Sequence, residues 1–285
     1  MAKKEMKNQE RKKQSEMFTR KRRNDEKEGI DMKTAIITGA SSGMGREFAK
    51  EIYRRYVNIE EVWVIARSKD KLDLLKQELG PKGVFVLPLD LTKEEDLETY
   101  KKTLEEKKPE VCILVNSAGY GKMGTFEEVG YEHNRGMVKT NCQSLTDVTY
   151  LTLPYMKFGG QIINLASSAA FVPQPEFAVY AATKSYVLSL SRALKYELMD
   201  RQITVTAVCP GPVKTEFFEV AEADGGKKPK TIKMLFMAKP KKVVKKAIED
   251  ARKGKEKSVY GITIQFLEVL CKVLPHSLIL KIIGK

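Results

Sequence analysis

The sequence predicts an α/β domain built on a doubly wound parallel sheet, and three observations support this fold class. Short apolar runs rich in β-branched residues alternate with helical patterns or loops, which is typical of repeated βαβ units. A glycine-rich turn follows the first of these runs. The chain of 285 residues suits one domain of ordinary size that buries a core on both faces of its sheet. We expect strands at residues 33–38, 61–66, 83–88, 111–115, 161–165, 203–208 and 257–260.

The glycine-rich turn lies between the first expected strand and an expected helix over Arg46 to Arg55. At a helix N-terminus, free backbone N–H groups and the helix dipole can hold a pyrophosphate, and glycine lets the backbone approach it closely. The same pattern can also serve only as a structural turn from strand to helix. The candidate phosphate-binding residues are Gly39, Ser41, Ser42, Gly43, Met44 and Gly45.

Tyr180 and Lys184 stand four residues apart in an expected helix, so they share one helix face. A phenol with a pKa of about 10 is a poor proton shuttle at neutral pH, and a nearby ammonium favours its ionised form. Many helices carry such a pair by chance. The pair is stronger evidence for a redox enzyme because Ser167 precedes Tyr180 by 13 residues and the glycine-rich turn lies upstream.

Five motifs occur in a fixed order along the chain. They are Thr38-Gly39 through Gly45, Asn116-Ser117-Ala118-Gly119, Ser167, Tyr180-x-x-x-Lys184 and Pro210-Gly211. This ordered set resembles the short-chain dehydrogenase/reductase family over about residues 32–265. The resemblance implies a Rossmann sheet of seven strands in the order 3-2-1-4-5-6-7 and an NAD(P)-dependent oxidoreductase that interconverts a ketone and a secondary alcohol.

The resemblance also implies roles for four side chains. Tyr180 would protonate the carbonyl oxygen, Ser167 would hydrogen-bond the same oxygen, and Lys184 would hold the nicotinamide ribose and lower the pKa of Tyr180. Asn141 matches the helix asparagine that positions a water linking the lysine to solvent, although a lone asparagine in a helix also serves as a local backbone partner. Ser168 competes for the serine role, but the spacing to Tyr180 favours Ser167.

The end of the second expected strand bears on cofactor choice. An acid there binds the ribose 2′-hydroxyl of NAD, while an arginine pairs with the 2′-phosphate of NADP. This chain has no carboxylate at the position, and Arg67 with Ser68 offers a charge-assisted phosphate site, which favours NADP(H) over NAD(H). Alternatively, Arg67 stacks on adenine and serves either cofactor. Ser42 also stands where many NADP-using relatives carry a basic residue.

Further cofactor contacts are implied at the ends of the other strands. Asp90 would contact the adenine amino group and Leu91 would line the ring, although Asp90 could instead cap a helix that begins near Thr92. The loops after the fourth and sixth strands supply the remaining candidates. These are Asn116, Ala118, Gly119, Pro210, Gly211, Val213 and Thr215.

Aromatic residues near the expected site predict an apolar small-molecule substrate. Phe217 and Phe218 lie in the segment of about residues 212–240 that covers the substrate in similar enzymes, and Phe171 follows Ser167. This composition resembles that of reductases acting on steroids and long acyl chains. We expect a hydroxysteroid dehydrogenase-like activity, for example at a steroid 17β or 20β position, with a long-chain 3-oxoacyl reductase as the alternative. A catalytically silent NAD(P)-binding scaffold or sensor is disfavoured because the catalytic set is complete.

Charge and cysteine content bound the remaining properties. The formal net charge is +14, and residues 1–31 form a basic polar extension with no signal-peptide-like apolar stretch. We expect a solvated arm or an exposed helix laid on the enzyme or its neighbour there, although the basic cluster at residues 20–23 could recruit nucleic acid or an anionic surface. We expect no nucleic-acid partner, because charges of both signs are mixed and no nucleic-acid motif is recognised. The four cysteines are far apart, so neither a metal site nor a disulfide is expected, and we expect a reduced, cytoplasmic protein.

The amphipathic tail, residues 266–285, could cover a cleft, a partner or a membrane surface. We expect a homodimer or homotetramer, as in relatives.

Overall fold

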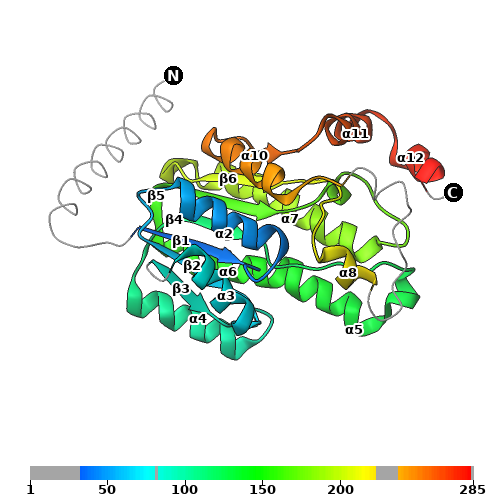
Figure 1. Ribbon diagram of the computed structural model, residues 1–285. Coiled ribbons are helices and arrows are strands. Elements are labelled where there is room, and N and C mark those ends of the chain that lie inside the picture. The colour runs from blue at the N-terminus through cyan, green and yellow to red at the C-terminus, as the bar shows by residue number, and fades with distance from the viewer. Residues whose placement is uncertain (1–32, 81–82, 223–236, 284–285) are drawn as a thin grey trace, which may run out of the picture. The chain divides into compact units, whose positions relative to one another are not determined.

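The computed structural model of the protein describes residues 33–80, 83–222 and 237–283. The expected extension over residues 1–31 and much of the expected substrate-covering segment, residues 223–236, lie outside these ranges. The described residues form an α/β domain around one central sheet (Figure 1).

Seven parallel strands form the sheet in the order β3-β2-β1-β4-β5-β6-β7, which confirms the predicted order. The central strands β1, β2, β4 and β6 are short runs of mostly apolar residues that are buried on both faces, as parallel sheets require. The strands are β1 (Lys33–Thr38), β2 (Glu61–Ile65), β3 (Val84–Leu87), β4 (Glu110–Asn116), β5 (Met156–Leu165), β6 (Thr204–Val208) and β7 (Lys257–Ser258).

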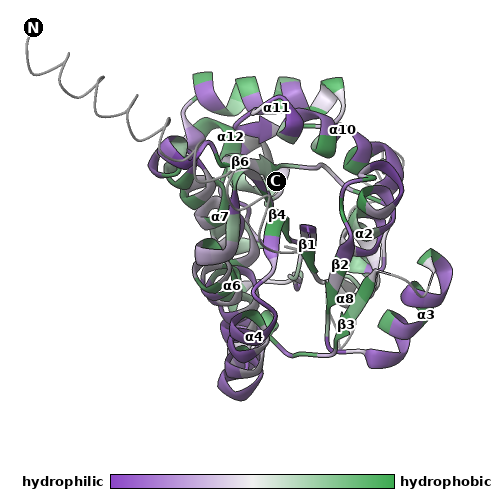
Figure 2. Ribbon diagram, turned by 90° about the vertical axis from the view of Figure 1, so that its left-hand side faces the viewer, coloured by the Kyte–Doolittle hydropathy of each residue, from purple (hydrophilic) through white to green (hydrophobic). Residues whose placement is uncertain are grey.

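Helices cover both faces of the sheet and make two separate cores. One core packs Phe48 and Ile52 of α2 and Val244 of α10 onto the strands, and the other packs Tyr100 of α4 and Val148 of α6. Figure 2 shows hydrophilic and hydrophobic residues alternating along these outer helices, which is typical of helices with one buried face. The helices are α2 (Gly43–Arg55), α3 (Lys69–Leu79), α4 (Glu94–Lys107), α5 (Phe126–Val138), α6 (Ser144–Thr152), α7 (Ala178–Glu197), α8 (Phe217–Glu222), α10 (Pro240–Arg252), α11 (Ile262–Val273) and α12 (His276–Ile283).

Polar side chains hold the carboxyl ends of the central strands in register. The hydroxyl of Thr38, at the end of β1, accepts hydrogen bonds from the backbone N–H groups of Ser117 and Ala118, both at 3.1 Å. The loops that follow β1 and β4 are therefore fixed side by side. In an open parallel sheet, ligands bind in the crevice outside these strand ends.

Among the described residues, no helix combines the length and the apolar character needed to cross a membrane.

Candidate active site

The turn between β1 and α2 has a geometry that only glycine permits. Gly39 and Gly43 have φ angles of 66° and 51°, in the left-handed region. A Cβ atom on Gly45 would lie 2.2 Å from the carbonyl oxygen of Gly39. Ser41 and Ser42 are partly exposed in the same turn, and Met44 is buried.

The N-terminus of α2 is suited to an anion. Ser42 is its N-cap residue but makes no side-chain cap hydrogen bond, and the first turn holds no acidic residue. The backbone N–H groups of the first turn are therefore not satisfied by a side-chain cap, and the helix dipole points its positive end at the turn. These residues fit the pyrophosphate of a dinucleotide.

The adenosine side of the crevice is formed at the ends of β2 and β3. Arg67 is exposed, and its positive charge opposes the rise in the pKa of the Tyr120 phenol that burial causes, so the guanidinium acts toward the loop after β4. The Ser68 hydroxyl accepts from the backbone N–H of Lys71 at 3.5 Å and thereby caps α3. The Ser68 side chain is therefore used to cap α3, whereas the Arg67 side chain is not.

Asp90 does not cap a helix, because α4 begins at Glu94 with Lys93 as its N-cap residue, and the Asp90 carboxylate instead closes a turn with Thr92. One of its carboxylate oxygens, Oδ1, accepts from the backbone N–H and the hydroxyl of Thr92, at 3.1 and 2.7 Å. Its other oxygen stays available, so an adenine contact is compatible with this turn. Leu91, the next residue, is buried beside it, and its carbonyl accepts from the Ser144 hydroxyl at 2.7 Å.

Asn116 differs from the sequence prediction. Its side chain is buried inside the domain, where the amide donates to Thr149 and to Asn164, both at 2.9 Å. It ties β4 to α6 and β5 instead of facing the crevice, because the polar partners lie beneath the strand ends. The backbone of Ala118, by contrast, lies against the glycine-rich turn, since a Cβ on Gly39 would come within 2.8 Å of it.

The loop after β6 crosses in front of the glycine-rich turn. A Cβ on Gly43 would lie 3.4 Å from the Cβ of Thr215, so these segments face each other. Val213 bridges to Ala238, and the Thr215 hydroxyl donates to the Val213 carbonyl at 3.4 Å. The Pro210 carbonyl accepts from Ser168 at 2.9 Å. Thr215 therefore borders the glycine-rich turn and Pro210 lies beside the residue that follows Ser167, while cofactor contacts of Gly211 and Val213 stay predictions.

The structure brings Ser167, Tyr180 and Lys184 together. Ser167 lies just after the carboxyl end of β5, and Tyr180 and Lys184 lie near the N-terminus of α7. Tyr180 and Lys184 are both buried on α7, and the Lys184 Nζ lies 5.6 Å from the centre of the Tyr180 ring. That Nζ donates to the carbonyl of Leu165 at 2.7 Å. The hydroxyl that hydrogen-bonds the Tyr180 phenol belongs to Ser167 and not to Ser168, in agreement with the spacing.

The electrostatics of this group correct one expectation. Burial raises the pKa of Tyr180 to about 12, and only the hydrogen bond with Ser167 opposes this shift. Burial also lowers the pKa of Lys184 to about 8. Lys184 therefore does not lower the pKa of Tyr180 here: its ammonium is itself destabilised by burial and is engaged by the Leu165 carbonyl.

Asn141 holds the loop after β4 against this group. It lies in a short π-helical segment, Lys139–Gln143, a feature common at functional sites. Its side chain bonds the backbone N–H and carbonyl of Tyr120 at 3.0 and 2.9 Å. A Cβ on Gly119 would lie 2.8 Å from Asn141 Oδ1 and 3.5 Å from Lys184 Nζ, so the three residues are neighbours. Asn141 therefore bonds the backbone of a loop that is distant in the sequence, instead of the backbone of its own helix.

Aromatic rings enclose Tyr180. Phe177 stacks on it with ring centres 4.2 Å apart, and Phe217 lies tilted at 5.4 Å. Phe218 contacts Phe217 edge-on at 5.5 Å. Phe177 is absent from the sequence prediction, and its position three residues before Tyr180, where it is the N-cap residue of α7, was the available signal.

Gly121 closes this aromatic group, because a Cβ there would come within 2.9 Å of the three rings of Phe177, Tyr180 and Phe217. Phe171 lies elsewhere: its ring packs against Val172, Cys271 and Ile279, under the C-terminal helices. A substrate role for Phe171 stays a prediction.

Comparison with known proteins agrees with this geometry. Residues 33–225 match the short chain dehydrogenase family. An uncharacterized oxidoreductase of Staphylococcus haemolyticus is 33% identical over 70% of this chain and 86% of its own. An 11-beta-hydroxysteroid dehydrogenase of Pinus massoniana is 31% identical over 66% of this chain and 53% of its own.

Two solved structures have a similar fold. A short-chain dehydrogenase from Sphingobium yanoikuyae in complex with NADPH superposes with a TM-score of 0.70 at 28% identity, over 85% of this chain and 96% of that one. A 3-ketoacyl-(acyl-carrier-protein) reductase from Brucella melitensis complexed with NADH gives 0.67 at 26% identity, over 81% and 97%. Sheet order, glycine-rich turn and sequence similarity therefore lead to one conclusion: the chain belongs to the short-chain dehydrogenase/reductase family of NAD(P)-dependent oxidoreductases that act on CH–OH groups.

Proposed function

We propose that this protein reduces an apolar ketone to a secondary alcohol, or catalyses the reverse reaction, with a hydroxysteroid as the substrate class and NADP(H) as the preferred cofactor. The observation that carries the proposal is the aromatic wall around Tyr180, formed by Phe177 and Phe217. A wall of this kind favours a flat apolar molecule over a polar sugar. The similarity to the hydroxysteroid dehydrogenase of Pinus massoniana supports the same substrate class.

The mechanism follows from the protonation states of three side chains. When bound, the nicotinamide supplies the hydride that reaches the carbonyl carbon. Tyr180 remains protonated at neutral pH because burial raises its pKa, so its hydroxyl can donate a proton to the carbonyl oxygen. The Ser167 hydroxyl orients that oxygen by a hydrogen bond. Lys184 lies beside the phenol and would hold the ribose hydroxyls of the bound cofactor, and Asn141 fixes the loop that borders Lys184.

A pH dependence follows from Lys184. Because its pKa is about 8 in the folded protein, the ammonium beside Tyr180 is lost as the pH rises above that value. We expect kcat/KM for ketone reduction to fall above about pH 8. Steady-state kinetics between pH 6 and pH 10 would measure this, and a profile that stays level up to pH 10 would contradict the assigned role.

Folding stability should change with pH in the opposite direction. Lys184 has an ordinary pKa of 10.5 when unfolded, so between about pH 8 and 10.5 the unfolded chain holds a proton that the folded chain has lost. The free energy of unfolding of the wild type should therefore rise over this window relative to that of Lys184→Met. Urea unfolding of both proteins isolates this contribution from those of other groups.

The cofactor preference is proposed from Arg67. The Arg67 guanidinium does not cap α3, whereas the Ser68 hydroxyl accepts a hydrogen bond from a backbone N–H group at the N-terminus of that helix. Changing Arg67 to Asp should move the preference from NADPH toward NADH, since a carboxylate would repel the 2′-phosphate and bind a ribose hydroxyl. The ratio of kcat/KM values for the two cofactors measures the shift, and Lys69→Asp, at an exposed position two residues away, is the control. A wild type that already prefers NADH would overturn the NADP proposal.

The substrate class is tested by a panel of ketones. The wild type should oxidise NADPH with ketosteroids faster than with 3-oxoacyl thioesters or polar sugars. The 3-oxoacyl reductase activity is the second candidate, because the Brucella melitensis reductase shares the fold over most of both chains. A preference for long 3-oxoacyl thioesters would replace the steroid proposal by this one. Phe177→Ala should lower activity on the preferred apolar ketone more than on a small ketone such as acetone.

We also propose that the protein forms a homodimer or homotetramer. The outer faces of α6 and α7 expose large apolar side chains, with Tyr150, Tyr186 and Tyr196 exposed by 77%, 42% and 66%. Exposed aromatic residues on neighbouring helices are typical of an interface between copies. Light scattering on the purified protein would measure the mass.

A further inference from the structure

Helix α11 has an apolar stripe on its outer face. Ile262, Phe266, Val269 and Val273 are exposed by 85%, 67%, 56% and 73%. Their spacing of four, three and four residues places them on one line along the helix. We call these four residues the α11 stripe.

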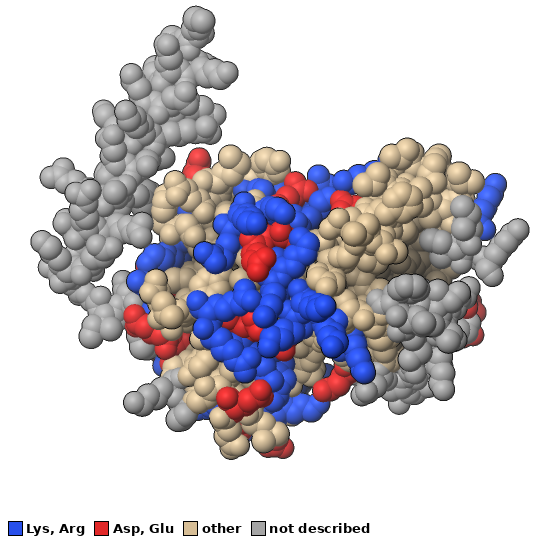
Figure 3. Space-filling view, turned by 45° about the horizontal axis from the view of Figure 1, so that its top comes forward, with Lys and Arg blue, Asp and Glu red and all other residues tan. Residues whose placement is uncertain are grey.

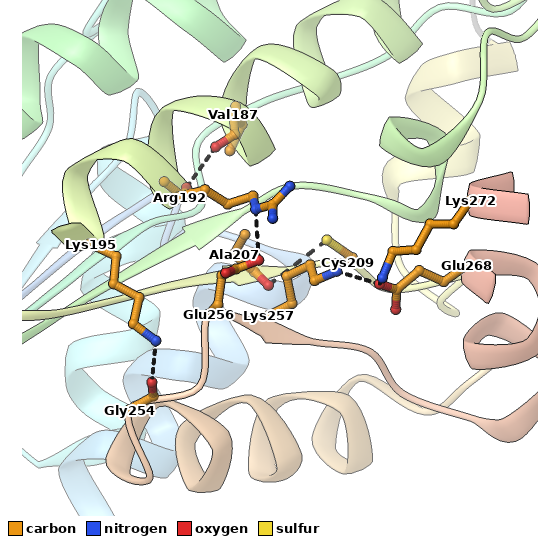
Figure 4. A network of polar contacts seen from close by, with 11 residues as sticks. Val187, Arg192, Lys195, Ala207, Cys209, Gly254, Glu256, Lys257, Glu268 and Lys272 are labelled. Atoms are coloured by element: carbon orange, nitrogen blue, oxygen red, sulfur yellow. Dashed lines mark hydrogen bonds and ion pairs between the residues drawn. The ribbon is translucent and has the colours of Figure 1, made fainter.

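The inner face of α11 is packed on the domain, so the stripe is not the core-facing side of the helix. Cys271 is buried together with Val172 and with Ile279 of α12. Glu268 forms ion pairs with Lys257 of β7 and, at 3.0 Å, with Lys272 (Figure 4). A helix that is apolar on two faces and packed on one requires a second apolar partner for the other.

The charges around the stripe specify the chemistry of that partner. Lys242 of α10 and Lys253 of the following loop are exposed, and Figure 3 shows a dense band of Lys and Arg over α2 and α10 beside a region of few charges over α11. The only acidic residue of α11, Glu268, is 14% exposed and paired. From residue 269 to residue 285 the sequence has three lysines and no Asp or Glu. The partner is therefore apolar at the stripe and anionic around it.

We infer that α11 docks the protein on an anionic lipid bilayer. With 12 residues the helix is far too short to span a hydrocarbon core, so it would lie in the interfacial plane with the stripe among the acyl chains. The lysines of α10 and Lys272 would contact lipid phosphates. A second copy fits less well: a stripe of four side chains offers much less than the roughly 800 Å² per partner of a stable interface, and two strongly basic faces repel.

The docked helices lie directly on the loops of the active site. Phe171 and Val172, which follow Ser167, pack against Cys271 and Ile279. A Cβ on Gly211 would lie 2.6 Å from Ile264 of α11. If the proposed function holds, docking would bring the substrate-binding loops close to the membrane in which an apolar ketone dissolves.

Vesicle flotation of the full chain tests the inference without any activity measurement. The wild type should float with phosphatidylcholine vesicles that contain phosphatidylglycerol, float less with phosphatidylcholine alone, and lose the difference at high salt. Phe266→Ser combined with Val273→Ser should lower the partition coefficient about tenfold or more, since two large apolar side chains no longer enter the bilayer. The matched control is Val57→Ser combined with Leu74→Ser, which removes exposed apolar side chains from other elements and should float like the wild type.

Each alternative result has a meaning. Absence of flotation by the wild type, or equal flotation of the stripe variant, would overturn the inference. If the wild type did not float with vesicles, and the stripe variant had a lower molar mass than the wild type by light scattering, the stripe would be an interface between copies. Lys242→Gln combined with Lys253→Gln should weaken only the preference for phosphatidylglycerol. NADPH binding by every variant shows that the fold is kept, and it separates this inference from a failure of the proposed function.

Discussion

Replacing Tyr180 by phenylalanine is expected to lower kcat by about 10²–10⁴-fold, because the substitution removes a positioned general acid. The affinity for NADPH should remain nearly unchanged. The ring and its stacking partner Phe177, 4.2 Å away, are both kept, so the aromatic wall should survive. Steady-state kinetics and fluorescence titration of NADPH would measure the two quantities separately.

The control for this experiment is Tyr196→Phe, which removes a phenol from an exposed position of the same helix, and it should leave kcat unaltered. Turnover by Tyr180→Phe at the wild-type rate would show that another group protonates the carbonyl oxygen.

Lys184→Met should lower turnover and weaken cofactor binding, because the same ammonium lies beside the Tyr180 phenol and would bind the ribose of the cofactor. We expect kcat to fall by about 10²-fold or more, together with a higher Kd for NADPH. The fold should be kept, since the methionine chain can fill the same buried space. The matched control is Lys195→Met on the same helix, whose Nζ donates to the Gly254 carbonyl at 2.7 Å, far along α7 from Tyr180. If Lys184→Met lost turnover but bound NADPH like the wild type, the ribose contact would be excluded.

The fold could be predicted closely because the central strands are compact apolar runs rich in β-branched residues, and helical patterns or loops separate them. The differences lie at the ends of elements. β5 begins at Met156 instead of residue 161, because its first residues pair with Val111 across an irregular register that no apolar pattern marks. Helix α2 begins at Gly43, earlier than the apolar spacing suggests, since its first turn holds glycines and carries no periodic signal.

The candidate site was predictable where spacing determines geometry. Tyr180 and Lys184 meet because they share a helix face, and Ser167 joins them from the end of β5. Side-chain direction at strand ends was not predictable: Asn116 is the last residue of a strand that is buried on both faces, so alternation of polar and apolar residues gives no indication of its orientation. The rise in the pKa of Tyr180 was also not predictable, because it is caused by burial and the spacing between Tyr180 and Lys184 does not indicate how deeply the phenol is buried.

The stoichiometry of the reaction shows whether this protein couples NADPH oxidation to the reduction of an apolar ketone. The wild type is incubated with NADPH and an apolar ketone such as a ketosteroid, and the consumption of NADPH is compared with the formation of the secondary alcohol by mass spectrometry. We predict that the two amounts rise together in a ratio of one to one, and that Tyr180→Phe accumulates both far more slowly although it binds NADPH. Tight NADPH binding without consumption, across ketosteroids, 3-oxoacyl thioesters and small ketones, would contradict the account and identify a silent NADP(H)-binding protein.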